Sequence, residues 1–377
     1  MDKAGIYIHI PFCRRKCGYC DFYLVTNLSV ISKFVDNLIN EIKLSSVSYK
    51  DIEFDTVFFG GGTPSLLSTD SLSRILIALK ESYEISGDAE ITIESNPEDF
   101  YNDTGKPAIL RDMGFNRISL GVQSLVDEEL KFLTREHDSS MAVKVIENLL
   151  NYFYNLSVDV IYSLPGQNRP AVGKTIDKLL VLEVPHVSAY TLIFEPNTVF
   201  NKFKRKNLIH PNDDFQEALL YDFISDKLTG AGYNHYEVSN YALPGFESRH
   251  NIKYWDYIDC VGFGPSAHSL FKGSRWNNTR NIITYNKLLQ ENLLPRENVK
   301  VLTVTEMQNE FIMCGLRGQG VDLNKYKILF GEDFSSVFKD KIGYYTGFGT
   351  AEITNERFRL TRKGYLLADE ITLSFVL

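Results

Sequence analysis

The sequence has little of what marks membrane, secreted or nucleic-acid-binding proteins. No apolar run approaches the roughly 18 residues that a membrane-spanning helix needs, and residues 1–5 carry no signal-peptide core. The formal charge is −8, so no general attraction to nucleic acid is expected. Only five of the 377 residues are cysteines, which suits a reducing compartment better than a disulfide scaffold. We therefore expect a cytoplasmic protein without a transmembrane segment, whose association with a membrane would be transient and through a partner.

Three of the five cysteines are grouped near the start of the chain. Cys13, Cys17 and Cys20 follow a short apolar run with the spacing C-x3-C-x2-C. Thiolates bind iron–sulfur clusters, and three of them on one loop can hold three irons of a [4Fe–4S] cluster while the fourth stays open. An open coordination position is typical of a reactive metal site. A four-thiolate zinc site is less well supported, because Cys260 and Cys314 are distant and lack a paired spacing. Three cysteines cannot all be paired in disulfide bonds with one another, which weighs against a disulfide interpretation. The simplest alternative is that the three are unrelated cysteines in a loop.

The first half of the chain alternates strand-like and helix-like segments. Strand-like runs cover residues 5–11, 56–59, 90–94, 117–120, 158–162 and 186–194, and helix-like patterns include residues 30–43, 71–83, 142–154 and 172–182. Strands that alternate with helices are typical of βαβ units around a parallel sheet. We therefore predict an α/β fold with six such units.

An unusual polar or glycine-rich segment follows each predicted strand. These segments are the cysteine loop, Gly60-Gly61-Gly62-Thr63-Pro64, Glu94-Ser95-Asn96-Pro97, Gly121-Val122-Gln123-Ser124, Ser163-Leu164-Pro165-Gly166-Gln167 and Glu195-Pro196, with Asp159 inside the fifth strand and Tyr190 inside the sixth. The carboxyl ends of the strands of a β/α barrel meet at one face, where active sites form. We expect these segments to converge on one site.

The cysteine spacing behind one strand and the glycine motif behind the next resemble the radical S-adenosylmethionine (SAM) superfamily. The resemblance implies a partial (β/α)6 barrel in which Cys13, Cys17 and Cys20 hold a [4Fe–4S] cluster, whose open iron takes the amino and carboxylate groups of SAM. In that superfamily the reduced cluster cleaves SAM to a 5′-deoxyadenosyl radical. The same resemblance implies cofactor contacts for Gly61, Gly62 and Thr63 (methionine end of SAM), for Glu94, Gln123, Arg135 and Asp159 (ribose and carboxylate), and for Tyr7 (cluster region).

Each of these cofactor residues also has a plain structural alternative. The triple glycine could be only a turn, although glycines let backbone approach a ligand closely. Arg135 would suit the SAM carboxylate, because a guanidinium pairs with a carboxylate in a planar fork, but it could instead form a surface ion pair with Glu136 or Glu128. Glu94 could be a solvent-exposed acid, and Tyr7 could serve barrel packing alone.

The wider pattern is similar to one branch of the superfamily, the oxygen-independent coproporphyrinogen III oxidases and their relatives. Residues 7–20, 60–64, 121–124, 134–136, 159–167 and 360–369 carry this resemblance, which covers essentially the whole chain. The oxidases extend their motif to C-x3-C-x2-C-x-C and have a long N-terminal extension that helps enclose the substrate. Here Phe22 stands at the fourth cysteine position, and twelve residues precede Cys13. The ending Cys20-Asp21-Phe22 instead resembles the HemW family of haem chaperones.

A second motif points to the same family. His250-Asn251-Ile252-Lys253-Tyr254-Trp255 resembles the HN-x-x-YW motif of HemW proteins, in which the histidine is implicated in haem binding, and residues 235–242 also look like that family. Imidazole is a common axial ligand of haem iron, and aromatic side chains can cover the macrocycle. The plain alternative for His250 is a satisfied buried or loop histidine. His268 is a weaker candidate, for which a structural role is favoured.

The sequence pattern changes after about residue 303. Helix-like segments at residues 305–315, 323–330 and 362–377, with a predicted hairpin at residues 351–360, resemble a small winged-helix-like α+β module. Winged helices often bind DNA, but residues 301–377 hold nine Lys or Arg and ten Asp or Glu, so no basic excess supports that role. We divide the chain into a barrel (1–230), a connecting region with the HN-x-x-YW motif (231–300) and a C-terminal module (301–377).

The resemblance implies a haem chaperone that binds a [4Fe–4S] cluster, SAM and haem and delivers the haem to respiratory haem proteins. No catalytic residue is assigned, because binding residues alone do not show whether SAM is cleaved in function. Two enzyme alternatives stay open: an authentic coproporphyrinogen III oxidase, and a radical SAM enzyme that acts on an unrelated small molecule. A purely structural metal-binding protein would leave the motifs at the strand ends unexplained. The recipient protein and a homodimer are left open.

Overall fold

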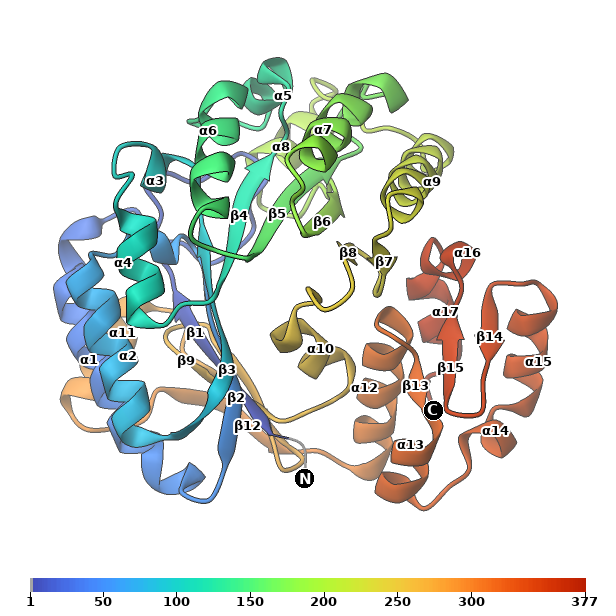
Figure 1. The fold of residues 1–377 in the computed structure, drawn as a ribbon. Coiled ribbons are helices and arrows are strands. Elements are labelled where there is room, and N and C mark those ends of the chain that lie inside the picture. The colour runs from blue at the N-terminus through green and yellow to red at the C-terminus, as the bar shows by residue number, and fades with distance from the viewer. Residues whose placement is uncertain (1–2) are drawn as a thin grey trace.

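The computed structural model describes residues 3–377 and contains a twelve-stranded sheet of order β12-β11-β10-β9-β1-β2-β3-β4-β5-β6-β8-β7. Six parallel strands form its centre: β1 (Ala4–Ile10), β2 (Glu53–Gly61), β3 (Glu84–Ser95), β4 (Arg117–Gln123), β5 (Asn155–Tyr162) and β6 (His186–Thr191). The sheet curves into an incomplete barrel (Figure 1). All six predicted strands are present, and the predicted partial (β/α)6 barrel is confirmed.

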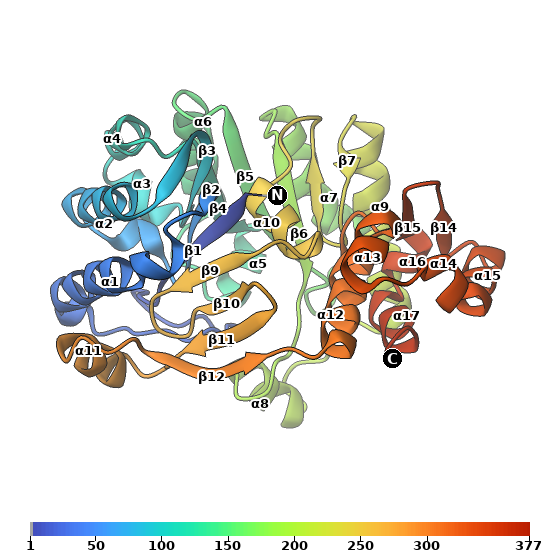
Figure 2. The ribbon, with the colours of Figure 1, turned by 90° about the horizontal axis from the view of Figure 1, so that it is seen from below.

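Helices from the connections between strands cover the outer face of the sheet (Figures 1 and 2). They are α1 (Ile31–Ser45), α2 (Thr69–Ser82), α3 (Glu98–Tyr101), α4 (Lys106–Met113), α5 (Asp127–Phe132), α6 (Ser139–Leu150) and α7 (Arg169–Val181), and α8 (Val199–Arg205) and α9 (Asp214–Gly230) follow β6. Side chains of Ser68, Asp138 and Asn168 cap the amino ends of α2, α6 and α7. Within residues 3–377, no helix is long and apolar enough to cross a membrane.

The sheet continues past both edges of the barrel in segments that the sequence analysis left unassigned. Beside β1 lie β9 (Cys260–Phe263), β10 (His268–Phe271), β11 (Ser274–Asn278) and β12 (Arg296–Val301), with α11 (Ile282–Gln290) inserted before β12. Beside β6 lie β8 (Asn240–Ala242) and β7 (Asn234–His235). Residues of the expected connecting region therefore extend the barrel sheet, and the division of the chain into domains stays a prediction.

Helix α10 (Arg249–Trp255) lies inside the barrel, against the concave face of the sheet (Figure 1). It contacts β1 and β2 on one side and α12 (Val304–Arg317) of the C-terminal module on the other. Its last aromatic residue, Trp255, packs so closely on Gly318 that a Cβ there would lie 2.4 Å from the Cβ of Trp255. The helix therefore connects the interior of the barrel with the C-terminal module.

The C-terminal module has its own core and a separate small sheet. After α12 come β13 (Val321–Asp322), α13 (Leu323–Phe330), α14 (Phe334–Val337), α15 (Lys339–Gly347), β14 (Ala351–Ile353), β15 (Arg357–Leu360), α16 (Arg362–Tyr365) and α17 (Ala368–Ser374), with strand order β13-β15-β14. Phe311, Phe334 and Phe375 belong to its core. Ion pairs from Arg357 and Arg362 reach back toward the barrel. The predicted small α+β module is present.

A buried carboxyl group ties α1 to the extended edge of the sheet. Glu41 is only 2% exposed and accepts hydrogen bonds from the backbone N–H of Gly264 (2.9 Å), the side-chain amide of Asn278 (2.6 Å) and the hydroxyl of Tyr285. Burial raises the pKa of Glu41 to about 7, although the three donors oppose the shift. Because the folded chain holds this proton more tightly than the unfolded chain, stability falls as the pH rises toward this pKa.

We predict that Glu41→Gln removes part of the pH dependence of unfolding. The pKa of Glu41 rises from 4.5 to about 7 on folding. As the pH rises from 4.5 to 7, the free energy of unfolding of the wild type should therefore fall by about 3 kcal/mol on account of this carboxyl group. Urea unfolding at pH 5 and pH 8 measures the loss in the wild type and in the variant. The exposed control Glu84→Gln should keep the wild-type difference. If Glu41→Gln lost as much stability between pH 5 and pH 8 as the wild type, Glu41 would not be the group responsible for the loss.

Candidate functional site

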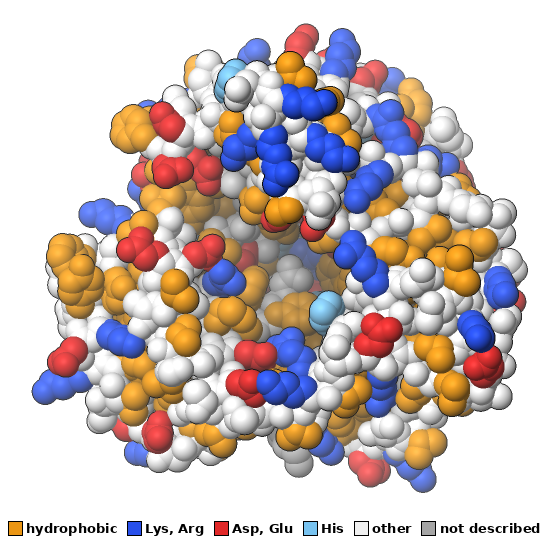
Figure 3. Space-filling view, turned by 180° about the vertical axis from the view of Figure 1, so that it is seen from behind, with side chains coloured by type: hydrophobic (Ala, Val, Ile, Leu, Met, Phe, Trp, Pro, Cys, Tyr) orange, Lys and Arg blue, Asp and Glu red, His pale blue; other side chains and the backbone are white. Residues whose placement is uncertain are grey.

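A cavity of about 570 Å³ opens where the carboxyl ends of β1–β6 meet, on the hollowed face seen in Figure 3. Its volume lies in the roughly 300–1,000 Å³ range of small-molecule sites. Ten of the twelve predicted site residues are in its wall: Cys13, Cys17, Cys20, Gly61, Gly62, Thr63, Glu94, Gln123, Arg135 and Asp159. Tyr7 and His250 are not in this wall.

The cysteine loop is held by backbone hydrogen bonds. The N–H of Cys13 donates to the carbonyl of Val25 at 3.2 Å, and the N–H of Cys20 donates to the carbonyl of Cys17 at 3.2 Å. All three thiols are free, and Sγ of Cys13 lies 3.2 Å from the hydroxyl oxygen of Thr63. Burial raises the pKa of the Cys13 thiol to about 11, so a metal that binds there must displace the proton.

The three thiols have the donor chemistry of an iron–sulfur cluster. Among residues 3–377, no group of three or more His, Cys, Asp or Glu side chains converges on a point where one metal ion could bind. A [4Fe–4S] cluster offers a separate iron to each thiolate, so its ligands surround a volume and not a point. Cys13, Cys17 and Cys20 surround part of the cavity in this way. The residues present therefore fit an iron–sulfur cluster with one iron left open.

The glycine turn after β2 packs directly on the cysteine loop. The N–H of Gly62 donates to the carbonyl of Ile10 at 2.8 Å, and the N–H of Thr63 donates to the carbonyl of Phe12 at 2.7 Å, which continues the β1–β2 pairing past the strands. A side chain at residue 62 would place its Cβ 2.6 Å from the Phe12 carbonyl oxygen. Gly61 has φ of +110°, which favours glycine. The turn thus exposes bare backbone to the cavity.

Two carboxyl groups line the cavity, Glu94 from β3 and Asp159 from β5, and each accepts few hydrogen bonds from the protein. Oε2 of Glu94 accepts the N–H of Gly61 at 2.9 Å, and burial, together with the charge of Asp159, raises the pKa of Glu94 to about 8. Oδ1 of Asp159 accepts the hydroxyl of Ser119 at 3.1 Å, and burial raises the pKa of Asp159 to about 6. Both groups retain acceptor capacity for ligand hydroxyls.

Arg135 points into the site and not to the surface. Its Nη2 donates to Oδ1 of Asn96 at 2.5 Å and to the carbonyl of Gly121 at 2.9 Å, and its Nη1 lies 3.8 Å from Sγ of Cys17. In the described part of the chain it forms neither of the surface ion pairs considered as alternatives, and its buried Nε has no partner. A guanidinium with such spare donor capacity can pair with a carboxylate.

Asn96 was not assigned a role from the sequence, although it connects two predicted residues. Its Nδ2 donates to Oγ1 of Thr63 at 3.0 Å, and its Oδ1 accepts from Arg135. The feature of the sequence that could have identified Asn96 is its position in the polar segment that follows the third strand. Tyr19 and Tyr190 also line the cavity without an assigned role.

Tyr7 lies deeper, inside the barrel. Its hydroxyl is 3.1 Å from Nδ1 of His9, and its ring stacks on Phe58 and His250 with centroid separations of 6.1 and 6.4 Å. These contacts fill the lumen beneath the cavity. A role of Tyr7 at the cluster stays a prediction.

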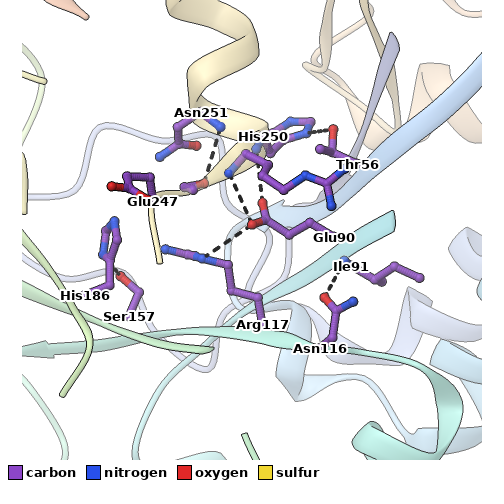
Figure 4. Close-up of polar contacts among 12 residues, drawn as sticks. Thr56, Glu90, Ile91, Asn116, Arg117, Ser157, His186, Glu247, His250 and Asn251 are labelled. Atoms are coloured by element: carbon purple, nitrogen blue, oxygen red, sulfur yellow. Dashed lines mark hydrogen bonds and ion pairs between the residues drawn. The ribbon is translucent and has the colours of Figure 1, made fainter. Parts of the chain in front are cut away.

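His250 lies deeper again, near the amino ends of the strands (Figure 4). Its ring is 1% exposed, with Nδ1 2.9 Å from the hydroxyl of Thr56 and Nε2 3.1 Å from the hydroxyl of Tyr254. Its backbone N–H donates to Glu90 at 3.0 Å. Burial lowers the pKa of His250 to about 3, so the ring is neutral, as a metal ligand must be. Both ring nitrogens are nevertheless occupied, as in a satisfied buried histidine. The weaker candidate, His268, is exposed on β10.

Comparison with known proteins finds relatives of the whole chain. The radical SAM superfamily model matches residues 7–179, and the HemN C-terminal domain model matches residues 302–367. The chain is 36% identical over 374 residues to the heme chaperone HemW of Lactococcus lactis, which covers 98% of this chain and 97% of that protein. It is 32% identical over 375 residues to the heme chaperone HemW of Bacillus subtilis, with 98% of each chain covered. The chain belongs to the HemW family.

A solved structure shares the fold of this chain. Coproporphyrinogen III oxidase (HemN) from Escherichia coli, a radical SAM enzyme, superposes with a TM-score of 0.84 over 99% of this chain and 90% of that chain. The two chains are 23% identical, so the likeness shows the fold alone. Membership of the radical SAM superfamily implies a [4Fe–4S] cluster and SAM, which the cavity residues described above suit.

We predict that Gly62→Ala disrupts the junction between the glycine turn and the cysteine loop. The new Cβ would meet the Phe12 carbonyl oxygen at 2.6 Å, a backbone atom that cannot rotate away. Calorimetry of the anaerobic, cluster-reconstituted protein should show SAM affinity reduced by about tenfold or more.

The matched control is Gly87→Ala, because no heavy atom lies within 4 Å of a Cβ at Gly87. Its SAM affinity should equal that of the wild type. Wild-type affinity in Gly62→Ala would show that the turn does not position the cofactor.

Proposed function

We propose that this HemW-family chain is a haem chaperone of the radical SAM type, which binds haem and delivers it to respiratory haem proteins. What supports the proposal is the identity of 36%, over nearly the full length of both chains, to a protein named as a heme chaperone. The proposed location is the cytoplasm, with transient membrane association through a haem recipient. A homodimer is compatible with the proposal but not required by it.

The cavity would hold the cluster and SAM. Cys13, Cys17 and Cys20 would bind three irons, and the backbone of residues 61–63 would approach the methionine end of SAM. Arg135 would pair with the SAM carboxylate through its free donor capacity. Glu94 would accept hydrogen bonds from the ribose hydroxyls. When bound and reduced, the cluster would supply the electron for SAM cleavage.

The chaperone function is favoured over porphyrinogen oxidation by the residue two positions after the last of the three cysteines. Phe22 stands where the oxidases have a further cysteine, and its side chain is 68% exposed at the wall of the cavity. A phenyl ring offers apolar surface where a thiol would offer a redox-active or metal-binding group. The alternative of a coproporphyrinogen III oxidase therefore becomes an outcome of the test.

Haem ligation by His250 would require a local rearrangement. One ring nitrogen would have to leave its hydroxyl partner, Thr56 or Tyr254, before it could reach iron. Because α10 carries both His250 and Tyr254, movement of this helix would leave their contact intact and would free Nδ1 from Thr56, which lies on β2. His250 as the axial ligand stays a proposal that depends on this movement.

The test is an anaerobic haem titration of the cluster-reconstituted protein, followed by the Soret band. We expect saturable binding, transfer of the haem to a haem-free respiratory cytochrome, and no decarboxylation of coproporphyrinogen III with SAM and reductant. His250→Ala should weaken binding by about tenfold or more if this ring is the ligand. Tyr254→Phe removes one hydrogen bond of the ring and should strengthen binding.

Controls separate ligation from folding. His210→Ala changes an exposed histidine and should leave binding unchanged. Thermal unfolding of His250→Ala reports the stability lost with its hydrogen bonds, about 1–3 kcal/mol. Decarboxylation of coproporphyrinogen III, or the absence of specific haem binding by the wild type, would overturn the proposed function.

A further inference from the structure

One rim of the cavity is formed by exposed apolar side chains. Phe22 is 68% exposed and Ile193 is 60% exposed, and both line the cavity together with Leu24 and Leu192. They come from the cysteine loop and from the end of β6. Apolar side chains gathered around one opening, unlike those scattered singly over a surface, mark a binding site.

Positive charge lies next to this rim. Lys202, Lys204 and Arg205 of α8, with Lys206 after it, are exposed, and within residues 3–377 none of the four is in an ion pair shorter than 4.0 Å. The chain as a whole carries a formal charge of −8, so this basic group runs against the general charge of the molecule. Figure 3 shows Lys and Arg side chains gathered on one side of the hollow, with hydrophobic side chains at its edge.

Helix α8 is fixed to the cysteine loop, so the apolar rim and the basic helix form one unit. The N–H of Phe200 donates to the carbonyl of Gly18 at 3.0 Å. The Phe200 ring packs so closely that a Cβ at Gly18 would lie 2.4 Å from it. The ring is 3% exposed and shares a small core with Ile161 and Leu192, which line the cavity.

We propose, on the basis of the proposed chaperone function, that this rim is a haem-docking site. The macrocycle would lie on Phe22 and Ile193, and the two propionates would point toward Lys202 and Lys206. Haem is a flat apolar disc with two carboxylates on one edge, which matches apolar surface bordered by positive charge on one side. Asp21 and Glu195 also line the cavity, so the carboxylates are directed to α8 and away from these acids.

This site does not depend on a histidine ligand, which makes metal-free protoporphyrin IX the decisive probe. We titrate it into the full-length, cluster-reconstituted protein and follow its absorption and fluorescence. The double variant Lys202→Glu/Lys206→Glu and the single variant Phe22→Ser should each weaken binding by about tenfold or more. All three side chains are exposed, so the variants should keep the wild-type melting temperature.

The matched control is Lys327→Glu/Lys339→Glu, which makes the same change of charge on exposed residues of the C-terminal module. It should leave porphyrin binding unchanged. Protoporphyrin IX dimethyl ester, which lacks the carboxylates, should bind wild type and Lys202→Glu/Lys206→Glu equally. Sensitivity of the ester to the charge reversal would show that the lysines do not contact the propionates.

The failure of this site and the failure of the proposed function can be told apart. If the wild type binds haem but Phe22→Ser and Lys202→Glu/Lys206→Glu bind protoporphyrin IX as the wild type does, the docking site is overturned and the chaperone function stands. If the wild type binds neither haem nor protoporphyrin IX, both are overturned. Because the rim needs no histidine ligand, His250→Ala should bind protoporphyrin IX as the wild type does, and loss of that binding would contradict a docking site at the rim.

Discussion

The site depends on the junction between β1 and β2. Their parallel pairing continues beyond the strands through the hydrogen bonds from Gly62 to Ile10 and from Thr63 to Phe12. This junction fixes the first residue of the cysteine loop against the glycine turn, so that Cys13 meets Thr63. It requires glycine at residue 62, because the Phe12 carbonyl occupies the space of a side chain. One short stretch of sheet therefore positions both the proposed cluster ligands and the backbone proposed to contact SAM.

The lumen of the barrel contains two layers of buried polar groups with opposite roles. Near the amino ends of the strands, Glu90 accepts the first N–H groups of α10, from Arg249 and His250, and lies 4.0 Å from Nε of Arg117 (Figure 4). His186 is equally occupied, by the hydroxyls of Ser157 (2.7 Å) and Tyr236 (2.8 Å). Glu90 and both ring nitrogens of His186 have partners here, whereas Nε of Arg117 has only the 4.0 Å ion pair and no hydrogen bond. Helix α10 closes that end of the lumen.

At the carboxyl ends of the strands, the polar groups are less fully satisfied. Glu94 and Asp159 have raised pKa values because burial is not balanced by enough donors, and Nε of Arg135 has no partner. Such unmet hydrogen-bonding capacity is costly in a folded chain unless a ligand satisfies it. Glu94, Asp159 and Arg135 also line the cavity, which indicates that this end of the barrel binds ligands.

The sequence was sufficient to predict the central parallel sheet and the grouping of residues at the ends of its strands. The six central strands are buried β-branched runs, and parallel strands bring their carboxyl ends together, which is why residues as distant as Cys13, Glu94 and Asp159 could be grouped in advance. The strands β9–β12 escaped prediction because they are short and partly polar; β12 has no buried residue. The H-N-x-x-Y-W pattern did not reveal that Thr56 and Tyr254 occupy the His250 ring. Those contacts depend on how α10 enters the barrel, which no local pattern encodes.

The measurement that tests the account most directly is the EPR spectrum of the reduced, cluster-reconstituted protein before and after the addition of SAM. If Cys13, Cys17 and Cys20 hold the cluster as we propose, one iron stays without a protein ligand, so SAM should change the g-values and line shape of the [4Fe–4S]⁺ signal. A [4Fe–4S]⁺ spectrum that SAM leaves unchanged would contradict the central claim that this cavity holds a cluster with an open iron and its cofactor.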